Sequence, residues 1–396
     1  MGIVILSRNF SSRLIGRYNC YYNRLSSSIN QQQKQRKMST TTTTDEVLFE
    51  TKGDKALITL NRPKALNSLS LNMVRLIYPQ LVKWDADPNI RMIIIKSNME
   101  KAFCAGGDVR EIAESGPNSE LSRNFFREEY ILNHKISVLG VPYIALINGI
   151  CMGGGVGVSV HGPFRVSTEN TIIAMPETQI GFFCDVGGSY FLPKLPGKLG
   201  VYLGLTGRRL KGLDIQKAGL ATHFVPSSHI SALENDLYRI ENANAAKISH
   251  LLSKYQEQWK DEYKQEFSLK PYIGRINSAF DADSVEQIVQ NLEKDGSEWA
   301  KEVLEDLSKA SPTSLKVTFE QLKRGKSLSL PDCLTMEYRL SQNILQHKDF
   351  YIGIRARLIE KTNNPQWDPK TLAEVTNQTV QSMFGPIDGG IKDLEL

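Results

Sequence analysis

The chain has 396 residues, of which 41% are hydrophobic and 23% charged, a composition typical of a globular protein with one large domain or two smaller ones. Every apolar run is shorter than the roughly 20 residues needed to cross a bilayer, so a membrane-spanning protein is not indicated. The net charge of +5 arises from residues 1–44, which hold seven of the 48 basic side chains and none of the 43 acidic ones. Because the remainder is close to neutral, a nucleic-acid partner is not indicated either.

The first 44 residues are rich in Arg and Ser, and their apolar residues are spaced so that a basic amphipathic helix could form. These features are typical of a mitochondrial transit peptide. A low-complexity tail is the alternative, supported by the Gln and Thr runs at 31–33 and 40–44. The charge asymmetry favours the transit peptide, with the mitochondrial matrix as its destination.

The segment that follows shows strand and helix signals in alternation. Strands are predicted at 47–50 and 56–61, separated by turn residues, which indicates a hairpin. Ser70 is a suitable N-cap for a helix in which Pro79 predicts a kink or a break. The β-branched run at 92–96 is typical of a strand covered on both faces.

The middle of the chain continues the same alternation. Residues 101–110 are predicted to form a buried strand, a glycine turn and a short helix, and a longer helix is expected around 125–131. A strand at 143–147 then leads into a glycine-rich stretch. Residues 201–225 read as two helices and a strand. Helical periodicity predominates beyond Pro226, so we predict an α/β core at 45–226 and a helical region at 227–396.

Two glycine turns carry the strongest functional signal. Gly107 and Gly154 each follow a strand where a helix begins, and Glu177 and Asp185 come shortly after the second turn. Glycines let the backbone approach a ligand closely, and a helix start presents unpaired N–H groups to it. Each carboxylate taken alone would be a helix cap. Together, the four residues predict an oxyanion hole with an acid/base pair.

Several other classes of site lack their signature. The chain has no GxSxG elbow, no Walker A pattern and no strict GxGxxG, so a serine hydrolase triad, ATP and NAD are not indicated. The five cysteines are scattered without metal-ligand spacing, and a reducing compartment fits them best. Cys184 lacks a neighbouring base and is predicted to be inert. We interpret His161 and His223 as packing or hydrogen-bonded residues.

Four of these motifs, in the same order and with similar gaps, resemble the enoyl-CoA hydratase/isomerase (crotonase) superfamily over about residues 45–370. The motifs are Asn61-Arg-Pro-Lys-Ala-Leu-Asn67, Ala102-Phe-Cys-Ala-Gly-Gly-Asp108, Asn148-Gly149 with Met152-Gly-Gly-Gly155, and Met175-Pro-Glu177 with Ile180-Gly181. A second set is similar to the thioester-hydrolase branch of that superfamily. It comprises Phe125-Phe-Arg-Glu-Glu-Tyr130, Ser159-Val-His-Gly162, Asp185-Val-Gly-Gly188 with Tyr190-Phe-Leu-Pro193, Ser311-Pro-Thr-Ser-Leu-Lys316 and Leu334-Thr-Met-Glu-Tyr-Arg-Leu-Ser-Gln342.

The resemblance implies an α/β fold, with a crotonase-like spiral ββα core and a C-terminal helical region. It also implies an acyl-CoA substrate, whose thioester oxygen would lie between the amides of Gly107 and Gly154. In that arrangement Glu177 is the catalytic carboxylate, and Asp185 holds a 3-hydroxyl and helps to position water. Glu129 is then a substrate-binding acid. No separate cofactor or metal is expected, because CoA is part of the substrate, and a homo-oligomer is left open.

The same resemblance places Lys64, Ala65 and Leu66 along the adenine end of CoA. Cys184 and Ile352 depart from it, since relatives usually carry a proline and an acid at these positions. Hydratases of the superfamily use a glutamate at the position of Gly157, so water addition is disfavoured.

The predicted reaction is hydrolysis of a 3-hydroxyacyl-CoA to the free acid and CoA. Glu177 would act either as nucleophile or as general base. The alternatives are an enoyl-CoA hydratase or isomerase, and a mitochondrial ribosomal small-subunit protein derived from this family.

Overall fold

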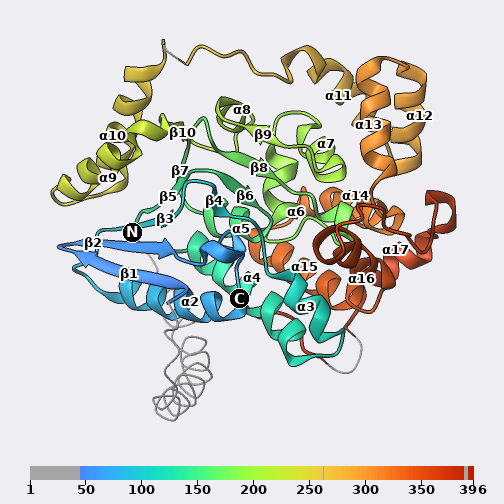
Figure 1. Cartoon of the computed structure of the whole chain (residues 1–396), viewed down its shortest axis with the longest axis horizontal. Coiled ribbons are helices and arrows are strands. Elements are labelled where there is room, and N and C mark those ends of the chain that lie inside the picture. The colour runs from blue at the N-terminus through green and yellow to red at the C-terminus, as the bar shows by residue number, and fades with distance from the viewer. Residues whose placement is uncertain (1–44, 262, 388–390) are drawn as a thin grey trace, which may run out of the picture. The chain divides into compact units, whose positions relative to one another are not determined.

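Two sheets receive strands in alternation along the chain (Figure 1). The computed structural model describes residues 45–261, 263–387 and 391–396, so the predicted transit peptide lies outside the described residues. The larger sheet has the order β1 (Val47–Lys52), β2 (Lys55–Leu60), β3 (Met92–Ser97), β5 (Tyr143–Ile147), β7 (Phe164–Ser167) and β10 (His223–Phe224). The smaller sheet has the order β4 (Ala102–Cys104), β6 (Ile150–Met152), β8 (Ile172–Ala174) and β9 (Leu210–Lys211).

Successive ββα turns stack on one another and confirm the predicted spiral core. β3, β5 and β7 are parallel neighbours in the larger sheet, and the strand after each of them, β4, β6 and β8, is a parallel neighbour in the smaller sheet. After these strands come α3 (Val109–Ser115), α5 (Gly154–Val160) and the 3-10 helix η3 (Glu177–Ile180), respectively. The stacking therefore brings the carboxyl ends of β4, β6 and β8 to one edge, where the predicted site residues follow.

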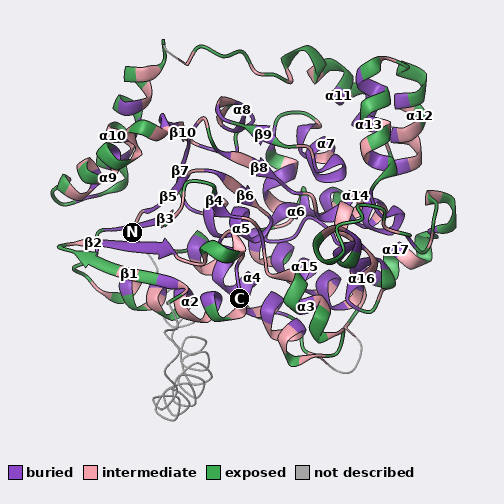
Figure 2. Cartoon of the chain, in the orientation of Figure 1, coloured by how far each residue is buried: buried purple, intermediate pink, exposed green. Residues whose placement is uncertain are grey.

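The N-terminal hairpin and its helix form largely as predicted. β1 and β2 pair antiparallel, and β2 is buried throughout while β1 is mostly exposed (Figure 2). The hydroxyl of Ser70 caps α2 (Leu71–Ala86) by accepting a hydrogen bond from the Met73 amide at 3.1 Å. The predicted break at Pro79 is wrong, because Pro79 lies on the exposed side of a helix whose opposite face buries Ile77 and Leu81. Burial of that apolar face outweighs the hydrogen bond that proline removes.

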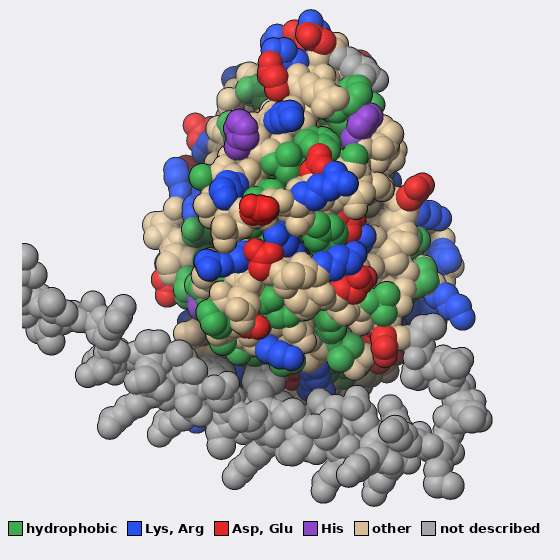
Figure 3. Space-filling view, turned by 90° about the vertical axis from the view of Figure 1, so that its left-hand side faces the viewer, with side chains coloured by type: hydrophobic (Ala, Val, Ile, Leu, Met, Phe, Trp, Pro, Cys, Tyr) green, Lys and Arg blue, Asp and Glu red, His purple; other side chains and the backbone are tan. Residues whose placement is uncertain are grey.

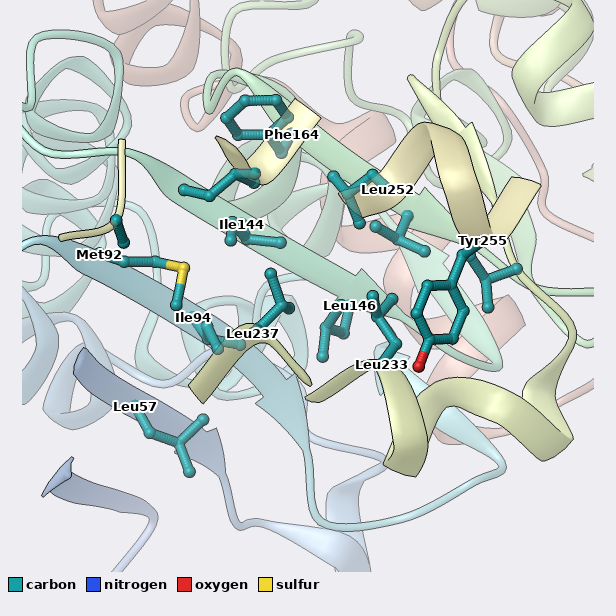
Figure 4. Packing of buried hydrophobic residues seen from close by; sticks show 14 residues of the cluster. Leu57, Met92, Ile94, Ile144, Leu146, Phe164, Leu233, Leu237, Leu252 and Tyr255 are labelled. Carbon is teal, nitrogen blue, oxygen red and sulfur yellow. The ribbon is translucent and has the colours of Figure 1, made fainter. Parts of the chain in front are cut away.

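Helices from beyond residue 226 cover one face of the larger sheet (Figure 4). Leu233 and Leu237 of α9 (Ile230–Arg239), with Leu252 of α10 (Ala245–Trp259), are buried against Leu57, Ile94, Ile144 and Leu146. Each such leucine contributes about 1.5–3 kcal/mol by leaving water. Residues Glu46–Leu396 form one compact unit, and the division of the chain near residue 226 stays a prediction.

The rest of the chain is helical, as its periodicity predicts. α4 (Glu120–Ser137) is the longer helix expected before β5, and α7 (Leu199–Thr206) and α8 (Leu213–Lys217) flank the short strand β9, which was not predicted. α6 (Gly188–Phe191) lies just beyond Asp185. The C-terminal helices are α11 (Ile273–Phe280), α12 (Val285–Asp295), α13 (Glu298–Ser308), α14 (Pro312–Gly325), α15 (Leu330–Ile344), α16 (Lys348–Ile354) and α17 (Asn377–Met383). Among the described residues, every helix is too short or too polar to span a bilayer.

α14 and α15 are the C-terminal helices that matter most for the site. Both contact α6, and α15 also contacts α4. The C-terminal region therefore lies against the elements that follow the glycine-rich stretch.

Candidate active site

The structure brings the two predicted glycine turns together. Gly107 follows β4, and Gly154 is the first residue of α5. A methyl carbon placed on Gly154 would lie 3.1 Å from the Gly107 nitrogen. Neither amide donates a hydrogen bond within the part of the chain that the structure describes. Two neighbouring N–H groups without acceptors can stabilise negative charge on a carbonyl oxygen.

The three consecutive glycines let α5 approach its surroundings closely. A methyl carbon on Gly155 would overlap the carbonyl oxygen of Cys104 in β4, at 2.3 Å. The same atom on Gly154 would lie 2.5 Å from Glu129 Oε1, and on Gly153 it would lie 2.8 Å from Glu177 Oε1. Only glycine leaves room for two carboxylates beside the paired amides.

Three carboxylates therefore meet at one place, although they are far apart in the sequence. Glu129 comes from α4, Glu177 begins η3, and Asp185 lies in the loop before α6; each is at most 6% exposed. The hydroxyl of Tyr130 donates a hydrogen bond to Asp185 Oδ2 at 2.9 Å. Within the described part of the chain, Glu129 Oε1 and Glu177 Oε2 have no hydrogen-bond partner. Such atoms are available to a ligand or to water.

Burial dominates the electrostatics of these carboxylates. It raises the pKa of Asp185 to about 7, against the opposing effect of the Tyr130 hydrogen bond. Burial followed by the charge of Asp185 raises the pKa of both Glu129 and Glu177 well above the ordinary range. Three acids so close in a dry site cannot all be ionised near neutral pH. The arrangement can therefore both hold and release protons.

The residues predicted to line the nucleotide end lie in a loop that is hydrogen-bonded to the segment before Gly107. Lys64 and Ala65 belong to the 3-10 helix η2 (Pro63–Ala65), and Leu66 ends it in a left-handed conformation. The Leu66 carbonyl accepts a hydrogen bond from the Ala105 amide at 3.1 Å. The Leu69 amide donates to the Gly106 carbonyl at 2.7 Å. The loop therefore runs beside the segment that carries Gly107, and Lys64 is exposed there.

Gly157, where hydratases of this fold would carry a glutamate, faces a crowded space. A methyl carbon there would lie 2.7 Å from Val186 Cβ and 2.9 Å from Asn133 Nδ2. Asn133 is fully buried, and among the described residues neither polar atom of its side chain has a partner. A carboxylate side chain at position 157 would require Val186 and Asn133 to move.

Several residues that contact the Asp185 loop could not be predicted from the sequence. Tyr130, Gln321 and Glu337 all form hydrogen bonds with residues 184–189. Tyr130 and Glu337 lie in motifs that the resemblance had singled out, but their partners are 55 and about 150 residues away. No local sequence pattern predicts contacts between residues so far apart. His161 is hydrogen-bonded, as predicted, and its partner is the Val186 carbonyl.

The four cysteines that the structure describes are all buried. Cys184 is buried, and burial followed by the charge of Glu177 raises the pKa of its thiol well above the ordinary value, which agrees with an inert cysteine. Among residues 45–261, 263–387 and 391–396, no cluster of His, Cys, Asp and Glu could hold a metal ion. The face shown in Figure 3 intersperses basic and acidic side chains.

Comparisons with known proteins agree with this geometry. Residues 55–384 match the sequence profile of the family Enoyl-CoA hydratase/isomerase. The chain is 55% identical over 352 residues to "3-hydroxyisobutyryl-CoA hydrolase, mitochondrial" of Danio rerio, covering 89% of this chain and 92% of that one. It is 51% identical to the Homo sapiens protein of the same name, covering 89% and 91%.

Solved structures show the same fold. A carnitinyl-CoA dehydratase from Mycobacterium thermoresistibile superposes with a TM-score of 0.80 at 37% identity, covering 87% of this chain and 98% of that one. An enoyl-CoA hydratase from Rhodobacter sphaeroides superposes with a TM-score of 0.78 at 32% identity, covering 89% and 100%.

Proposed function

The chain belongs to the enoyl-CoA hydratase/isomerase family, and we propose that within it the protein hydrolyses 3-hydroxyisobutyryl-CoA to 3-hydroxyisobutyrate and CoA. The reaction is a step of valine catabolism. The single observation that carries the proposal is the meeting of two free amides, Gly107 and Gly154, with three buried carboxylates. The hydrolase relatives, about half identical over nearly the whole chain, support the choice of substrate.

The enzyme is mitochondrial, and its relatives are named as mitochondrial proteins. We propose that residues 1–44, which lie outside the described residues, are the transit peptide that directs it to the matrix.

We assign Gly107 and Gly154 as the donors that hold the thioester carbonyl oxygen. Negative charge develops on this oxygen as the carbonyl carbon becomes tetrahedral. Each well-aimed amide contributes on the order of 3 kcal/mol to stabilising that charge. The loop of Lys64, Ala65 and Leu66, in which Lys64 is exposed, is our proposed contact for the adenine end of CoA.

Glu177 is the proposed catalytic carboxylate, and two routes suit its position. As a general base it takes a proton from water while the water oxygen bonds to the acyl carbon; collapse of the intermediate then expels CoA thiolate, which is protonated to the thiol. As a nucleophile, its own oxygen bonds to the acyl carbon and CoA leaves, forming an anhydride that water then opens. In both routes one water is consumed and the acid and CoA are released.

Asp185 and Glu129 are proposed to bind the acyl part of the substrate. Asp185 accepts from Tyr130, and its carboxyl has capacity left for a substrate 3-hydroxyl. Glu129 lies against Gly154 with Oε1 unpaired among the described residues. The raised pKa of Glu129 favours its protonated form, which can donate a hydrogen bond.

The hydratase alternative is disfavoured by the space at Gly157. Hydration by two glutamates needs a carboxylate there, and Val186 and Asn133 occupy the room that its side chain would need. A ribosomal role would not require the buried acids, which are costly to keep without a chemical use.

The test compares Glu177→Gln with the wild type on 3-hydroxyisobutyryl-CoA. We expect kcat to fall at least about 100-fold with binding of the thioester retained, because the change removes the base or nucleophile but keeps the shape. Glu293→Gln, on the exposed side of α12, is the matched control and keeps full activity. Near wild-type turnover of the Glu177 variant would reject the assignment.

A trapping experiment separates the two routes. Hydroxylamine added during turnover converts an anhydride at Glu177 into a hydroxamate, which mass spectrometry detects on the peptide that contains this residue. The general-base route leaves that peptide unmodified.

A further inference from the structure

The loop that carries Asp185 is held from three helices at once. Gln321 of α14 donates from Nε2 to the Cys184 carbonyl at 2.5 Å, and His161, which ends α5, meets the Val186 carbonyl through Nε2 at 2.7 Å. Glu337 of α15 accepts from the Gly187 amide at 2.7 Å. It also accepts from the amide of Ser189 at 2.9 Å and from its hydroxyl. The peptide groups on both sides of Asp185 are therefore fixed by side chains.

The backbone at this point adopts a conformation that its sequence disfavours. Val186 has φ of +52° and Gly187 has φ of +84°. A β-branched residue in the left-handed region is a genuine outlier, and such outliers persist only where surrounding contacts determine them. The contacts of His161 and Glu337 fall on these two residues.

The side chain of Val186 is also buried and closely packed. It lies against Gly157 of α5. The ring of His161 lies against Gly187, because a methyl carbon placed on Gly187 would be 2.5 Å from Cε1 of His161. Burial lowers the pKa of His161 to about 4, so the ring is neutral and its Nε2–H donates to the carbonyl. The turn thus has little freedom to relax toward α5.

Glu337 has no evident role other than this contact. It is fully buried, and it forms no ion pair with any described Lys, Arg or His. Burial raises the pKa of Glu337 to about 8, while the three hydrogen-bond donors oppose that rise. An unpaired buried carboxyl group is costly, and here its hydrogen bonds all go to the turn beside Asp185.

We propose that Glu337, together with His161, is a positioning residue that holds the turn at Val186 and Gly187 so that Asp185 meets the 3-hydroxyl of the substrate. The inference rests on the proposed function and deepens it. Glu337 acts on selectivity for the hydroxylated acyl group, and not on the thioester carbonyl, because Gly107, Gly154 and Glu177 are set by other elements. This role also makes α15, in the C-terminal region, a part of the substrate-recognition machinery.

The experiment measures kcat/KM for 3-hydroxyisobutyryl-CoA and for isobutyryl-CoA, which lacks only the hydroxyl. In Glu337→Gln the amide group faces the Gly187 N–H, so one hydrogen bond is lost and the turn is pushed away. We expect the ratio of the two kcat/KM values to fall about tenfold or more, as for a buried donor that is left without its acceptor. Asp332→Asn, an exposed acid-to-amide change in the same helix, is the control and keeps the wild-type ratio.

A double-mutant cycle with Asp185→Asn identifies the route of the effect. If Glu337 acts through Asp185, Glu337→Gln causes no further loss of selectivity once Asp185 is replaced. A merely structural contribution would instead lower both activities to the same extent in either background. Either an unchanged ratio in the single variant or a full additional loss in the double variant overturns the proposal.

A milder variant covers the case in which Glu337→Gln fails to fold. Ser189→Ala removes the hydroxyl donor and leaves the two amide donors to Glu337, so a smaller loss of the ratio in the same direction is expected. An unchanged ratio there counts against the proposal. Failure of the proposed function is seen separately, because the wild type would then show no preference for the hydroxylated thioester.

Discussion

At the scale of single residues, the negative charge on Asp185 raises the pKa of Glu177. After burial, that charge is the main cause of the raised pKa of Glu177. A base that must be ionised gains activity as the pH rises through its pKa, so the acidic limb of the pH profile lies above the usual range of glutamate. Burial gives Asp185 itself a pKa of about 7, so its own titration falls in the same window.

Asp185→Asn therefore shifts this limb to lower pH. Without the neighbouring negative charge, ionisation of Glu177 costs less and its pKa falls. The measurement is kcat/KM for isobutyryl-CoA between pH 5 and 9, a substrate that does not need the 3-hydroxyl contact. A limb that stays in place, or moves upward, would contradict the proposed proximity of the two acids in the working enzyme.

The role of a residue could be predicted where it belongs to a local motif, and could not be predicted where it depends on a contact with a residue far away in the sequence. The two glycine turns, with Glu177 and Asp185, were recognisable because turn chemistry needs particular residues at short spacing. The bond from Tyr130 to Asp185 and those from Glu337 to Gly187 join residues on different helices. Both side chains lie in motifs of the family resemblance, but no local pattern in the sequence indicates their distant partners.

At the scale of elements, the helix pair α9 and α10 serves as a cover for the larger sheet. Leu252 of α10 is fully buried in the cluster with Leu146 and Leu237, while its neighbour Leu251 is only partly buried. These helices contribute packing and none of the proposed site residues. Substitutions in these two helices should therefore change the stability of the protein without changing its catalytic activity.

Leu252→Ala is expected to lower the free energy of unfolding by about 2–5 kcal/mol, through lost burial and the cavity left behind. Leu251→Ala, the same chemical change one residue away, costs less. Urea unfolding followed by circular dichroism measures both, and kcat/KM stays at the wild-type value below the transition. Equal losses for the two variants would mean that the cluster does not pack as described.

Element prediction failed where burial overrides local preference. Pro79 would end a helix on propensity alone, but the buried face of α2 continues on both sides of it. β9 has two residues and is formed only by pairing with β8, so it carried no signal of its own. The strands at 92–96 and 143–147 were predictable because continuous burial on both faces leaves a β-branched apolar run.

At the scale of the whole molecule, we propose that targeting and catalysis belong to separate parts of the chain. The proposed site residues all lie within Glu46–Leu396, which is one compact unit. The charge imbalance lies in residues 1–44.

A chain starting at residue 45 is therefore expected to keep the kcat/KM of the full-length protein and to lose mitochondrial import. Import into isolated mitochondria, read as protection from added protease, measures the second property. Replacing the Arg residues of the segment by Gln in the full-length chain is the matched change, and it should abolish import equally. Import of the shortened chain would contradict the transit-peptide assignment.

The order of the elements along the chain also dictates when selectivity can appear. Each stacked turn supplies one part of the site: Gly107 after β4, Gly154 after β6 and Glu177 after β8, with Glu337 arriving much later in the chain. In a polypeptide that enters a compartment N-terminus first, Gly107 and Gly154 enter before α15. The turn beside Asp185 is fixed by Glu337 only after α15 has entered. An incompletely delivered chain would thus lack the selectivity for the hydroxylated thioester that the contact of Glu337 with this turn provides.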